Sequence, residues 1–552
     1  MMAGRYMKAF ARTSSGQSQA EGIALNATFS ELPGTLAEGV GQTVIVPRSV
    51  LLPTVHCSHI CLPSQPQPGP GDNQLTRSQF NPPGAQLLND IKHVVGDAGW
   101  MDVTDARRHF DDPRGRFEGR GSLVVLPNST QQVAAIVRLC NAAKAGIVPY
   151  SGGTGVVAGQ LSIDSDNAII MSLERMNKVR EISVDDSVLV AEAGCILETI
   201  HSAAQEQGMM FPLSMASKGS CCIGGNLATN AGGIQVLRYG NARDLCLGIE
   251  AVLPCGTILS ELSPLRKNNT GYDLRHLLIG SEGTLGIITA ASLILKPVDP
   301  ETATALLAIK SPAHALMVYK AIKGYLGDAV SALELMSGLG LDLVTSKFPS
   351  LRNPIEHSCD WALLLEATGP LGIGERLETA LTDCFENNLV LDAVVAQSQS
   401  QRENLWALRE NTPEANRMAG AFCNSDTSVP ISKIDAFITD TITAISDIHP
   451  DVRINSYGHI GDGNIHHNVI PPSGVTKAEF VASNPGIIDA VRMAINETSH
   501  RHGGSISAEH GIGRLKTRDL ETFAGKARYD AIRRIKFALD PNNIMNPGVL
   551  IN

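Results

Sequence analysis

The stretch Ser122–Gly155 reads SLVVLPNSTQQVAAIVRLCNAAKAGIVPYSGGTG and alternates between two kinds of segment. The apolar residues before Pro127 predict a short strand, and Ser129 is suited to cap a helix whose apolar residues recur at helical spacing. A second apolar segment then ends in the glycine loop Ser151–Gly155. Because glycine allows close approach, the backbone amides of this loop could line an anion. The order of strand, helix and strand favours an α/β or α+β domain.

The same alternation extends in both directions. A helical pattern, AQLLNDIKHVV, follows Pro82, and strand-like segments continue to about Pro297, where the charged, proline-containing sequence KPVDPE suggests a domain boundary. The remainder indicates a second domain of mixed strands and helices with a helical end. We therefore expect a disordered or targeting extension, an α/β or α+β domain, a second domain of mixed strands and helices, and a C-terminal helical segment, over residues 1–81, 82–297, 298–500 and 501–552.

Composition excludes several classes of protein. The 552 residues include 45 basic and 55 acidic side chains, a net charge of −10, which disfavours binding to nucleic acid. The longest apolar run, near 285–295, is too short for a transmembrane span. Eleven cysteines form no paired framework, so we expect a reducing compartment, the cytoplasm or alternatively the mitochondrial matrix.

The first 80 or so residues are proline-rich and lack a durable periodicity. Arg5, Lys8 and Arg12 precede the first acidic residue, a pattern typical of a mitochondrial transit peptide. A disordered leader or a misassigned start explains the same residues. Cys57 and Cys61 have the spacing of a metal site, but no second pair follows, so we expect no metal there.

The glycine loop fits neither common nucleotide motif. GTGVVA does not complete G-x-G-x-x-G, and the only Gly-Lys pair, Gly525-Lys526, continues with Ala527, which breaks the P-loop pattern. Taken alone, the loop is equally consistent with an ordinary tight turn. The Rossmann and Walker classes are therefore disfavoured.

Three further segments carry a specific resemblance: GSCCIGGNLATNAGG, YGNARDLCLGIEAVLPCGTIL and NNTGYDLRHLLIGSEGTLGIIT, at 219–233, 239–259 and 268–289. They resemble the FAD-binding domain of the vanillyl-alcohol-oxidase (PCMH-type) superfamily, in the branch of D-lactate, glycolate and D-2-hydroxyglutarate dehydrogenases. The resemblance implies an α+β fold, with a two-subdomain FAD-binding domain, an α+β cap and a helical end. It implies these FAD-binding residues: Pro149, Ser151, Gly152, Gly153, Thr154, Gly155, Ser220, Gly224, Gly225, Asn226, Thr229, Asn230, Gly232, Gly233, Tyr239, Gly240, Glu282, Gly283, Gly286, Ile287 and Asn546.

Some superfamily members attach the flavin covalently through a His or Cys near the first glycine loop. This loop holds Ser151 and Thr154 instead, so we expect noncovalent FAD. The pair Cys221-Cys222 lies in a glycine-rich segment, where we expect it to pack against the cofactor rather than to do redox chemistry.

The stretch HIGDGNIH sets His459 and His466 on either side of a Gly-Asp-Gly. In a straight strand they would diverge, but Gly461 and Gly463 permit a turn that brings both imidazoles together. Downstream, SAEHG offers Glu509, and two histidines with a carboxylate suit Zn²⁺ or a similar divalent metal. Hydrogen-bonded structural roles are the alternative. The resemblance implies that all three are metal ligands.

The resemblance also implies the residues that act on the substrate. His510 matches the proposed base, Asn468 a substrate-binding asparagine, and Arg409 an arginine that binds the substrate carboxylate. Oxidising an α-hydroxy acid needs a hydride acceptor and a base, which FAD and His510 would provide. D-2-hydroxyglutarate enzymes tend to carry threonine and lysine where this chain has Pro413 and Asn424, which puts recognition of a second carboxylate in doubt.

The sequence therefore predicts an FAD-dependent dehydrogenase that oxidises a D-2-hydroxy acid, of the D-2-hydroxyglutarate type, with metal assistance. The alternatives are a D-lactate or glycolate dehydrogenase, a flavin-free zinc hydrolase and a flavin-binding partner subunit. The expected partners are a small 2-hydroxy acid and an electron acceptor such as a quinone, cytochrome or electron-transfer flavoprotein. A homodimer is also considered, and neither nucleic acid nor a membrane span is expected.

Overall fold

The computed structural model describes residues 82–163, 167–356 and 359–551, all within one compact unit, Asn73–Asn552. The predicted extension 1–81, including the basic residues of the suggested transit peptide and the Cys57–Cys61 pair, lies outside the described residues. Among the described residues, no helix combines the length and apolar character that a bilayer crossing needs.

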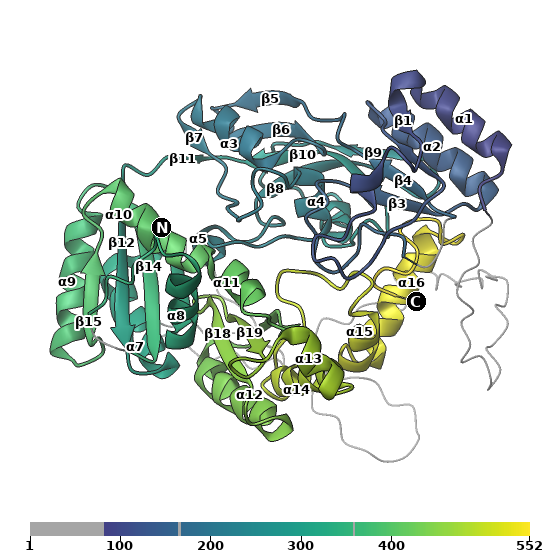
Figure 1. Ribbon diagram of the computed structural model, residues 1–552. Coiled ribbons are helices and arrows are strands. Elements are labelled where there is room, and N and C mark those ends of the chain that lie inside the picture. The colour runs from purple at the N-terminus through teal and green to yellow at the C-terminus, as the bar shows by residue number, and fades with distance from the viewer. Residues whose placement is uncertain (1–81, 164–166, 357–358, 552) are drawn as a thin grey trace, which may run out of the picture. The chain divides into compact units, whose positions relative to one another are not determined.

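The opening stretch of sequence forms the first sheet, a four-stranded one in the order β1-β2-β4-β3 (Figure 1). Strands β2, β4 and β3 run parallel, as strand–helix–strand connections require, and β1 pairs with β2 in the antiparallel direction. Ser129 caps the crossover helix through its side chain, as predicted. The elements are β1 (Trp100–Met101), β2 (Leu123–Val125), β3 (Ile147–Tyr150), β4 (Ile169–Ser172), α1 (Ala85–Val95) and α2 (Thr130–Ala143).

The second sheet is antiparallel, with the order β5-β6-β10-β8-β9. Every residue of its central strand β10, which reads IITAASLI, is buried, so the strand carries no charged side chain. Strands β7 and β11 form a separate antiparallel pair. The elements are β5 (Val179–Ser183), β6 (Val188–Glu192), β7 (Met209–Met210), β8 (Cys246–Val252), β9 (Ile258–Glu261), β10 (Ile287–Ile294), β11 (Lys296–Pro297), α3 (Leu197–Gln205), α4 (Ile223–Ala228), α5 (Val236–Tyr239) and α6 (Leu274–Leu278).

The third sheet has eight strands, in the order β15-β12-β14-β13-β18-β19-β16, with β17 paired to β19. Its paired strands are antiparallel throughout. It begins directly after the predicted boundary near Pro297, although the predicted division into domains stays a prediction. The strands are β12 (Glu301–Ile309), β13 (Val330–Ser337), β14 (Trp361–Gly369), β15 (Asp392–Val395), β16 (Cys423–Asn424), β17 (Thr427–Ser428), β18 (Arg453–His459) and β19 (Asn464–Ile470).

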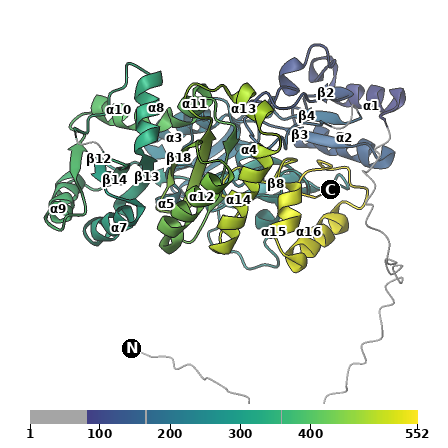
Figure 2. The ribbon, with the colours of Figure 1, turned by 60° about the horizontal axis from the view of Figure 1, so that its bottom comes forward.

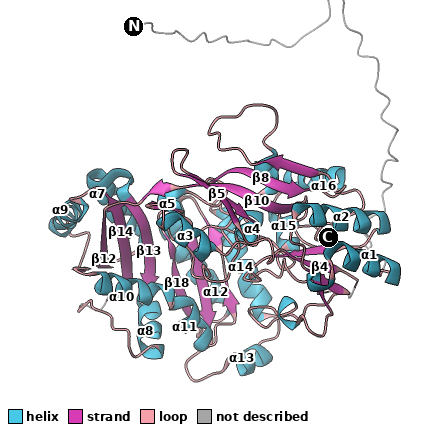
Figure 3. Ribbon diagram, turned by 90° about the horizontal axis from the view of Figure 1, so that it is seen from above, coloured by secondary structure: helices cyan, strands magenta, loops and turns pink. Residues whose placement is uncertain are grey.

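Helices cover both faces of this sheet (Figure 3). Alternate residues of β12 point to opposite faces, so Leu307 packs in the core under α7, α9 and α12, and Leu306 packs in the core under α8, α10 and α11. The helices are α7 (Pro312–Leu326), α8 (Gly338–Lys347), α9 (Ile373–Glu386), α10 (Gln399–Glu410), α11 (Thr412–Met418), α12 (Ile434–Ile448), α13 (Lys477–Ser483) and α14 (Ile487–Arg501).

The C-terminal segment returns to the first sheet. It contains α15 (Thr517–Phe523) and α16 (Lys526–Leu539), which lie next to each other in Figure 1 and Figure 2. Beyond α16, Met545 forms a parallel bridge with Ile147, the first residue of β3. The predicted α+β fold is confirmed, and the chain end is carried back to the glycine loop.

Candidate functional site

A cavity opens beside the first glycine loop, and eight glycines are among the residues that line it. It is bounded by this loop, by the start of α4, by the turn before β10 and by His510. Most of the predicted FAD-binding residues line it: Pro149, Ser151, Gly152, Gly153, Thr154, Gly155, Gly224, Gly225, Asn226, Thr229, Glu282, Gly283, Gly286, Ile287 and Asn546.

The glycines are needed here because backbone approaches backbone. A Cβ on Gly152 would lie 2.2 Å from the carbonyl oxygen of Ser220 and 2.8 Å from Cys221 Cα, closer than atoms can pack. The two glycine-rich segments are also joined by a hydrogen bond, from the Gly225 amide to Ser151 Oγ (3.1 Å). The cavity presents glycine backbone that a pyrophosphate can approach closely, so the residues present fit FAD.

Six of the predicted FAD-binding residues lie outside the cavity lining: Ser220, Asn230, Gly232, Gly233, Tyr239 and Gly240. Their roles are structural in part, since Asn230 Oδ1 accepts from the Arg243 amide and Tyr239 donates to Asp299. Conversely, Gln160 lines the cavity and donates to the Gly155 carbonyl oxygen. This contact was not predicted, because Gln160 belongs to no recognised motif.

The two histidines of HIGDGNIH lie on neighbouring antiparallel strands. Tyr457 in β18 pairs with His466 in β19, so His459, two residues further along β18, shares the same face. Their ring centroids are 6.2 Å apart. Gly463 turns the chain with φ 89°, as the sequence predicts. The hairpin therefore brings both imidazoles to one place.

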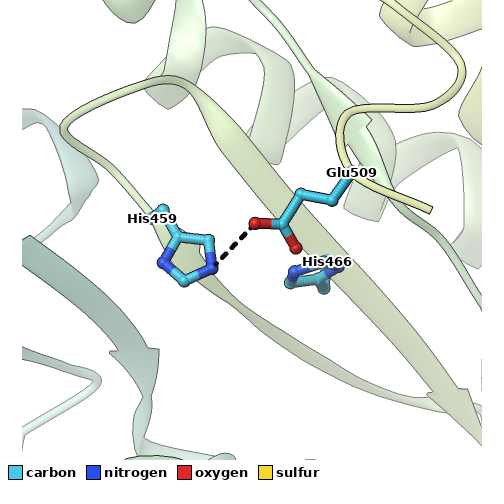
Figure 4. Close-up of side chains that lie close together, drawn as sticks. All are labelled: His459, His466 and Glu509. Atoms are coloured by element: carbon cyan, nitrogen blue, oxygen red, sulfur yellow. Dashed lines mark ion pairs between the residues drawn. The ribbon is translucent and has the colours of Figure 1, made fainter. Parts of the chain in front are cut away.

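Glu509 completes the group from the loop after α14 (Figure 4). Its Oε1 lies 3.6 Å from His459 Nε2, and one ligand atom from each of His459, His466 and Glu509 lies within 4.8 Å of the others. Ligands held about 2.0–2.2 Å from a zinc ion lie at comparable separations from one another. The predicted ligand set therefore has the geometry that a divalent metal needs.

Hydrogen bonds behind the two imidazoles orient them. His459 Nδ1 lies 2.5 Å from Glu334 Oε1, and His466 Nδ1 lies 3.0 Å from the Ser425 carbonyl oxygen. Each contact leaves the Nε2 atom for the group in the middle, the arrangement found behind metal-bound histidines. Glu334 was not predicted, because a lone glutamate within an apolar strand carries no sequence signal.

The electrostatics of Glu509 and His466 are compatible with a bound cation. Burial raises the pKa of Glu509 to about 7, and burial lowers the pKa of His466 to about 3, so its imidazole is neutral and available as a ligand. A buried carboxylate whose charge is unfavourable gains from a neighbouring positive ion. The donor set of two imidazoles and one carboxylate therefore fits Zn²⁺ or a similar metal.

Arg409 is buried against the same network. Its Nε donates to Glu334 Oε2 (2.7 Å), and its guanidinium lies 4.7 Å from the centroid of the Tyr457 ring. Burial opposes the charge of Glu334, but His459 and Arg409 lower its pKa to about 2. Glu334 thus holds the predicted carboxylate-binding arginine and a predicted metal ligand with its two oxygens.

Asp426 shapes the loop that carries Glu509 and His510. Its Oδ2 accepts from the His510 amide (2.8 Å) and lies 3.6 Å from His510 Nδ1. His510 also stacks on His466, with ring centroids 5.9 Å apart. Asp426 was not predicted either. It is 2% exposed, and its carboxylate accepts hydrogen bonds from the backbone amides of Glu509 and His510.

A second buried carboxylate joins this loop to the cavity. Glu282 accepts hydrogen bonds from the amides of Ile512 (2.8 Å) and Gly513 (2.7 Å). It lines the cavity, as does His510. The imidazole of His510 therefore lies where the glycine-lined cavity meets the group of His459, His466 and Glu509.

Asn468 lies on the same hairpin. It is 5% exposed, pairs with Asn424 across β16 and β19, and its Nδ2 meets no hydrogen-bond acceptor among the described residues. A buried donor without a partner is costly, so a ligand that accepts from it would be stabilised.

Two family models match this chain. Residues 121–260 match the family model described as FAD binding domain, and residues 298–550 match FAD linked oxidases, C-terminal domain.

Among curated relatives, the chain is 36% identical over 484 residues to the mitochondrial D-2-hydroxyglutarate dehydrogenase of Arabidopsis thaliana, covering 86% of this chain and 84% of that protein. It is 38% identical over 428 residues to a D-2-hydroxyglutarate dehydrogenase of Xanthomonas citri pv. viticola, covering 77% and 88%. The mitochondrial enzyme of Bos taurus is 37% identical over 432 residues, covering 78% and 77%.

Solved structures share the fold at low sequence identity. A 4-ethylphenol oxidase from Gulosibacter chungangensis has a TM-score of 0.66 at 21% identity, with 85% of this chain and 97% of that chain covered. A p-cresol methylhydroxylase has a TM-score of 0.66 at 16% identity, with 85% and 96% covered. The predicted PCMH-type arrangement is therefore confirmed.

Proposed function

This chain belongs to the FAD-linked oxidase family that includes the D-2-hydroxyglutarate dehydrogenases, and on that basis we propose that it oxidises D-2-hydroxyglutarate, or a similar D-2-hydroxy diacid, with the help of a divalent metal. It is an FAD-dependent D-2-hydroxy acid dehydrogenase. One observation supports the proposal: His510 lines the glycine-lined cavity and stacks on His466, so the proposed base would lie between FAD and the proposed metal.

FAD, when bound in the glycine-lined cavity, supplies the hydride acceptor. A metal held by His459, His466 and Glu509 supplies Lewis acidity to the substrate hydroxyl. Burial lowers the pKa of His510, although Asp426 opposes this effect, so the imidazole is neutral near pH 7 and can accept the hydroxyl proton at Nε2.

The remaining residues position the substrate. Arg409 offers its guanidinium to the carboxylate next to the reacting carbon, because its Nε is fixed by Glu334 and its orientation by the Tyr457 ring. Asn468 offers the buried Nδ2 donor that has no acceptor in the described part of the chain. Together they hold the hydroxy acid by one charged and one neutral group.

The proposal includes a noncovalent flavin. Cys221 and Cys222 line the cavity, but burial raises the pKa of both thiols, that of Cys222 to about 11, so the thiolate needed for covalent attachment is scarce. Denaturation should therefore release the yellow colour into solution. Colour that stays on the precipitated protein would contradict this part of the proposal.

The compartment and the electron acceptor are also proposals. Several relatives are named mitochondrial, and the basic leader residues agree with a mitochondrial matrix location, whereas other relatives are bacterial. A D-2-hydroxy acid oxidised without NAD passes its electrons to a second acceptor, for which a quinone, a cytochrome or an electron-transfer flavoprotein qualifies.

A D-lactate dehydrogenase is the second candidate, because Pro413 and Asn424 replace residues that D-2-hydroxyglutarate enzymes tend to carry. The test compares kcat/KM for D-2-hydroxyglutarate and D-lactate in the wild type and in Asn424→Lys. We expect the wild type to favour the diacid and the variant to favour it further. A wild-type preference for D-lactate above about tenfold, or about 1.4 kcal/mol, with no gain in the variant, would assign the monoacid instead.

A further inference from the structure

The loop 111–118 presents an arginine that the proposed mechanism does not use. The Gly115 amide donates to the Asp112 carbonyl oxygen (2.8 Å), closing a turn with Pro113 at its second position and Arg114 at its third. Proline at the second position and a glycine at the fourth are typical of a type I turn. Arg114 therefore extends from the tip of an ordered loop.

The two arginines of this loop differ in their contacts. Arg116 is engaged in the loop itself, since its Nε donates to Asp112 Oδ2 (3.2 Å) and its Nη2 to the Val156 carbonyl oxygen (2.6 Å). Arg114 forms no ion pair within the described ranges 82–163, 167–356 and 359–551. The Arg116 guanidinium therefore stabilises the loop, whereas the Arg114 guanidinium has no carboxylate partner among the described residues.

Arg114 contacts Asn424 on β16, the strand that pairs with β19. With the Asn424 amide oriented so that Nδ2 donates to Asn468 Oδ1 (2.6 Å), its Oδ1 accepts from Arg114 Nη1 (3.2 Å). Asn424 is the residue that stands where D-2-hydroxyglutarate enzymes tend to carry a lysine. Arg114, from the loop 111–118, therefore brings a positive charge to the position where those enzymes tend to carry a lysine.

Arg114 and Arg409 approach the same tyrosine. The Arg409 guanidinium lies 4.7 Å from the centroid of the Tyr457 ring, and the positive charge of Arg114 also acts on Tyr457. Both guanidiniums therefore lie near Tyr457.

We propose that Arg114 binds the distal carboxylate of a D-2-hydroxy diacid, while Arg409 binds the carboxylate next to the reacting carbon. The inference rests on the proposed function. A guanidinium can grip a carboxylate with two parallel hydrogen bonds, and the neutral Asn424 amide orients Arg114 without neutralising it. Recognition of the diacid then requires both Arg114 in the loop 111–118 and Arg409 in α10.

The test uses the flavin-loaded enzyme and the variants Arg114→Met, Arg114→Lys and Arg116→Gln. The measured quantity is kcat/KM for D-2-hydroxyglutarate divided by kcat/KM for D-lactate. We expect Arg114→Met to lower this ratio by roughly 10- to 100-fold, the range for a hydrogen bond to a charged group, and Arg114→Lys to lower it less. Arg116→Gln is the matched control, because it removes a neighbouring charge from the same loop, and it should leave the ratio within about threefold.

A binding measurement gives a second readout that does not depend on turnover. Glutarate and butyrate should each perturb the flavin spectrum, and Arg114→Met should weaken the affinity for glutarate but not for butyrate. An unchanged ratio and an unchanged glutarate affinity in Arg114→Met would overturn the inference, as would equal losses in the Arg116→Gln control. If the wild type itself fails to oxidise the diacid, the proposed function fails, which is a different result.

Discussion

The two halves of the site are built from different materials. The cofactor cavity is lined in large part by residues of local glycine motifs, whereas the substrate side consists of buried charged side chains from β13, β18, α10 and the loop after α14. The backbone conformation of the cofactor half depends on the positions of its glycines, whereas the charged group of the substrate half depends on each of its side-chain partners. A change in the first half should affect FAD alone, and a change in the second half should affect chemistry while FAD stays bound.

The largest effect is expected at the metal-binding group, where two adjacent histidines provide a matched pair. His466 faces Glu509, whereas His467 points into the core, with Nδ1 2.8 Å from Ser456 Oγ and its ring 5.3 Å from that of Phe437. His466→Ala should empty the metal site and lower kcat/KM by about 10⁴-fold or more, since a Lewis acid contributes several kcal/mol.

His467→Ala should instead retain stoichiometric metal and lose stability, by about 2 kcal/mol or more, because it leaves a cavity in the core. Metal analysis and thermal unfolding of the two variants separate these outcomes. Loss of metal in His467→Ala alone would reverse the assignment of the two histidines.

The next effect concerns the base. His510→Ala should slow anaerobic flavin reduction by roughly 10²- to 10⁴-fold, the usual contribution of one general base, with metal and FAD contents unchanged. Stopped-flow absorbance of the flavin measures this step separately from electron transfer to the acceptor. A reduction rate equal to that of the wild type would assign the proton to another group.

The smallest effect is expected in the backbone half and should appear as cofactor affinity. A Cβ at Gly152 meets backbone at 2.2 Å, whereas a Cβ at Gly155 meets only the end of the Gln160 side chain, at 3.0 Å. Gly152→Ala should weaken FAD affinity by about 10-fold, since overpacking costs about 1–3 kcal/mol. Gly155→Ala should bind FAD nearly as the wild type does, and both variants should retain metal. Equal FAD affinity in the two variants would contradict this role of the glycine backbone.

The backbone half could largely be predicted from the sequence. Glycine-rich segments such as Ser151–Gly155 are continuous in the sequence, and their glycines indicate where backbone can pack closely. Most of the predicted FAD-binding residues line the cavity. The exceptions, such as Asn230 and Tyr239, stand in the same motifs but turn toward neighbouring structure. A motif shows that a segment is near the cofactor but does not show which side chains face it.

The charged half was predictable only where a local motif existed. His459, His466 and Glu509 belong to such motifs, and the structure brings them together. Glu334 and Asp426 do not, because each acts across more than 80 residues of sequence, and only the pairing of β13 with β18 and the fold of the loop before His510 bring them to the site.

The central claim is that the metal-binding group acts on a hydroxy acid held against FAD. The most direct test is anaerobic reduction of the enzyme-bound flavin by D-2-hydroxyglutarate before and after removal of the metal by a chelator, and again after Zn²⁺ is added. The account predicts that chelated enzyme stays yellow and is no longer reduced, and that Zn²⁺ restores reduction. Metal-free enzyme whose FAD is reduced at the original rate would contradict the account.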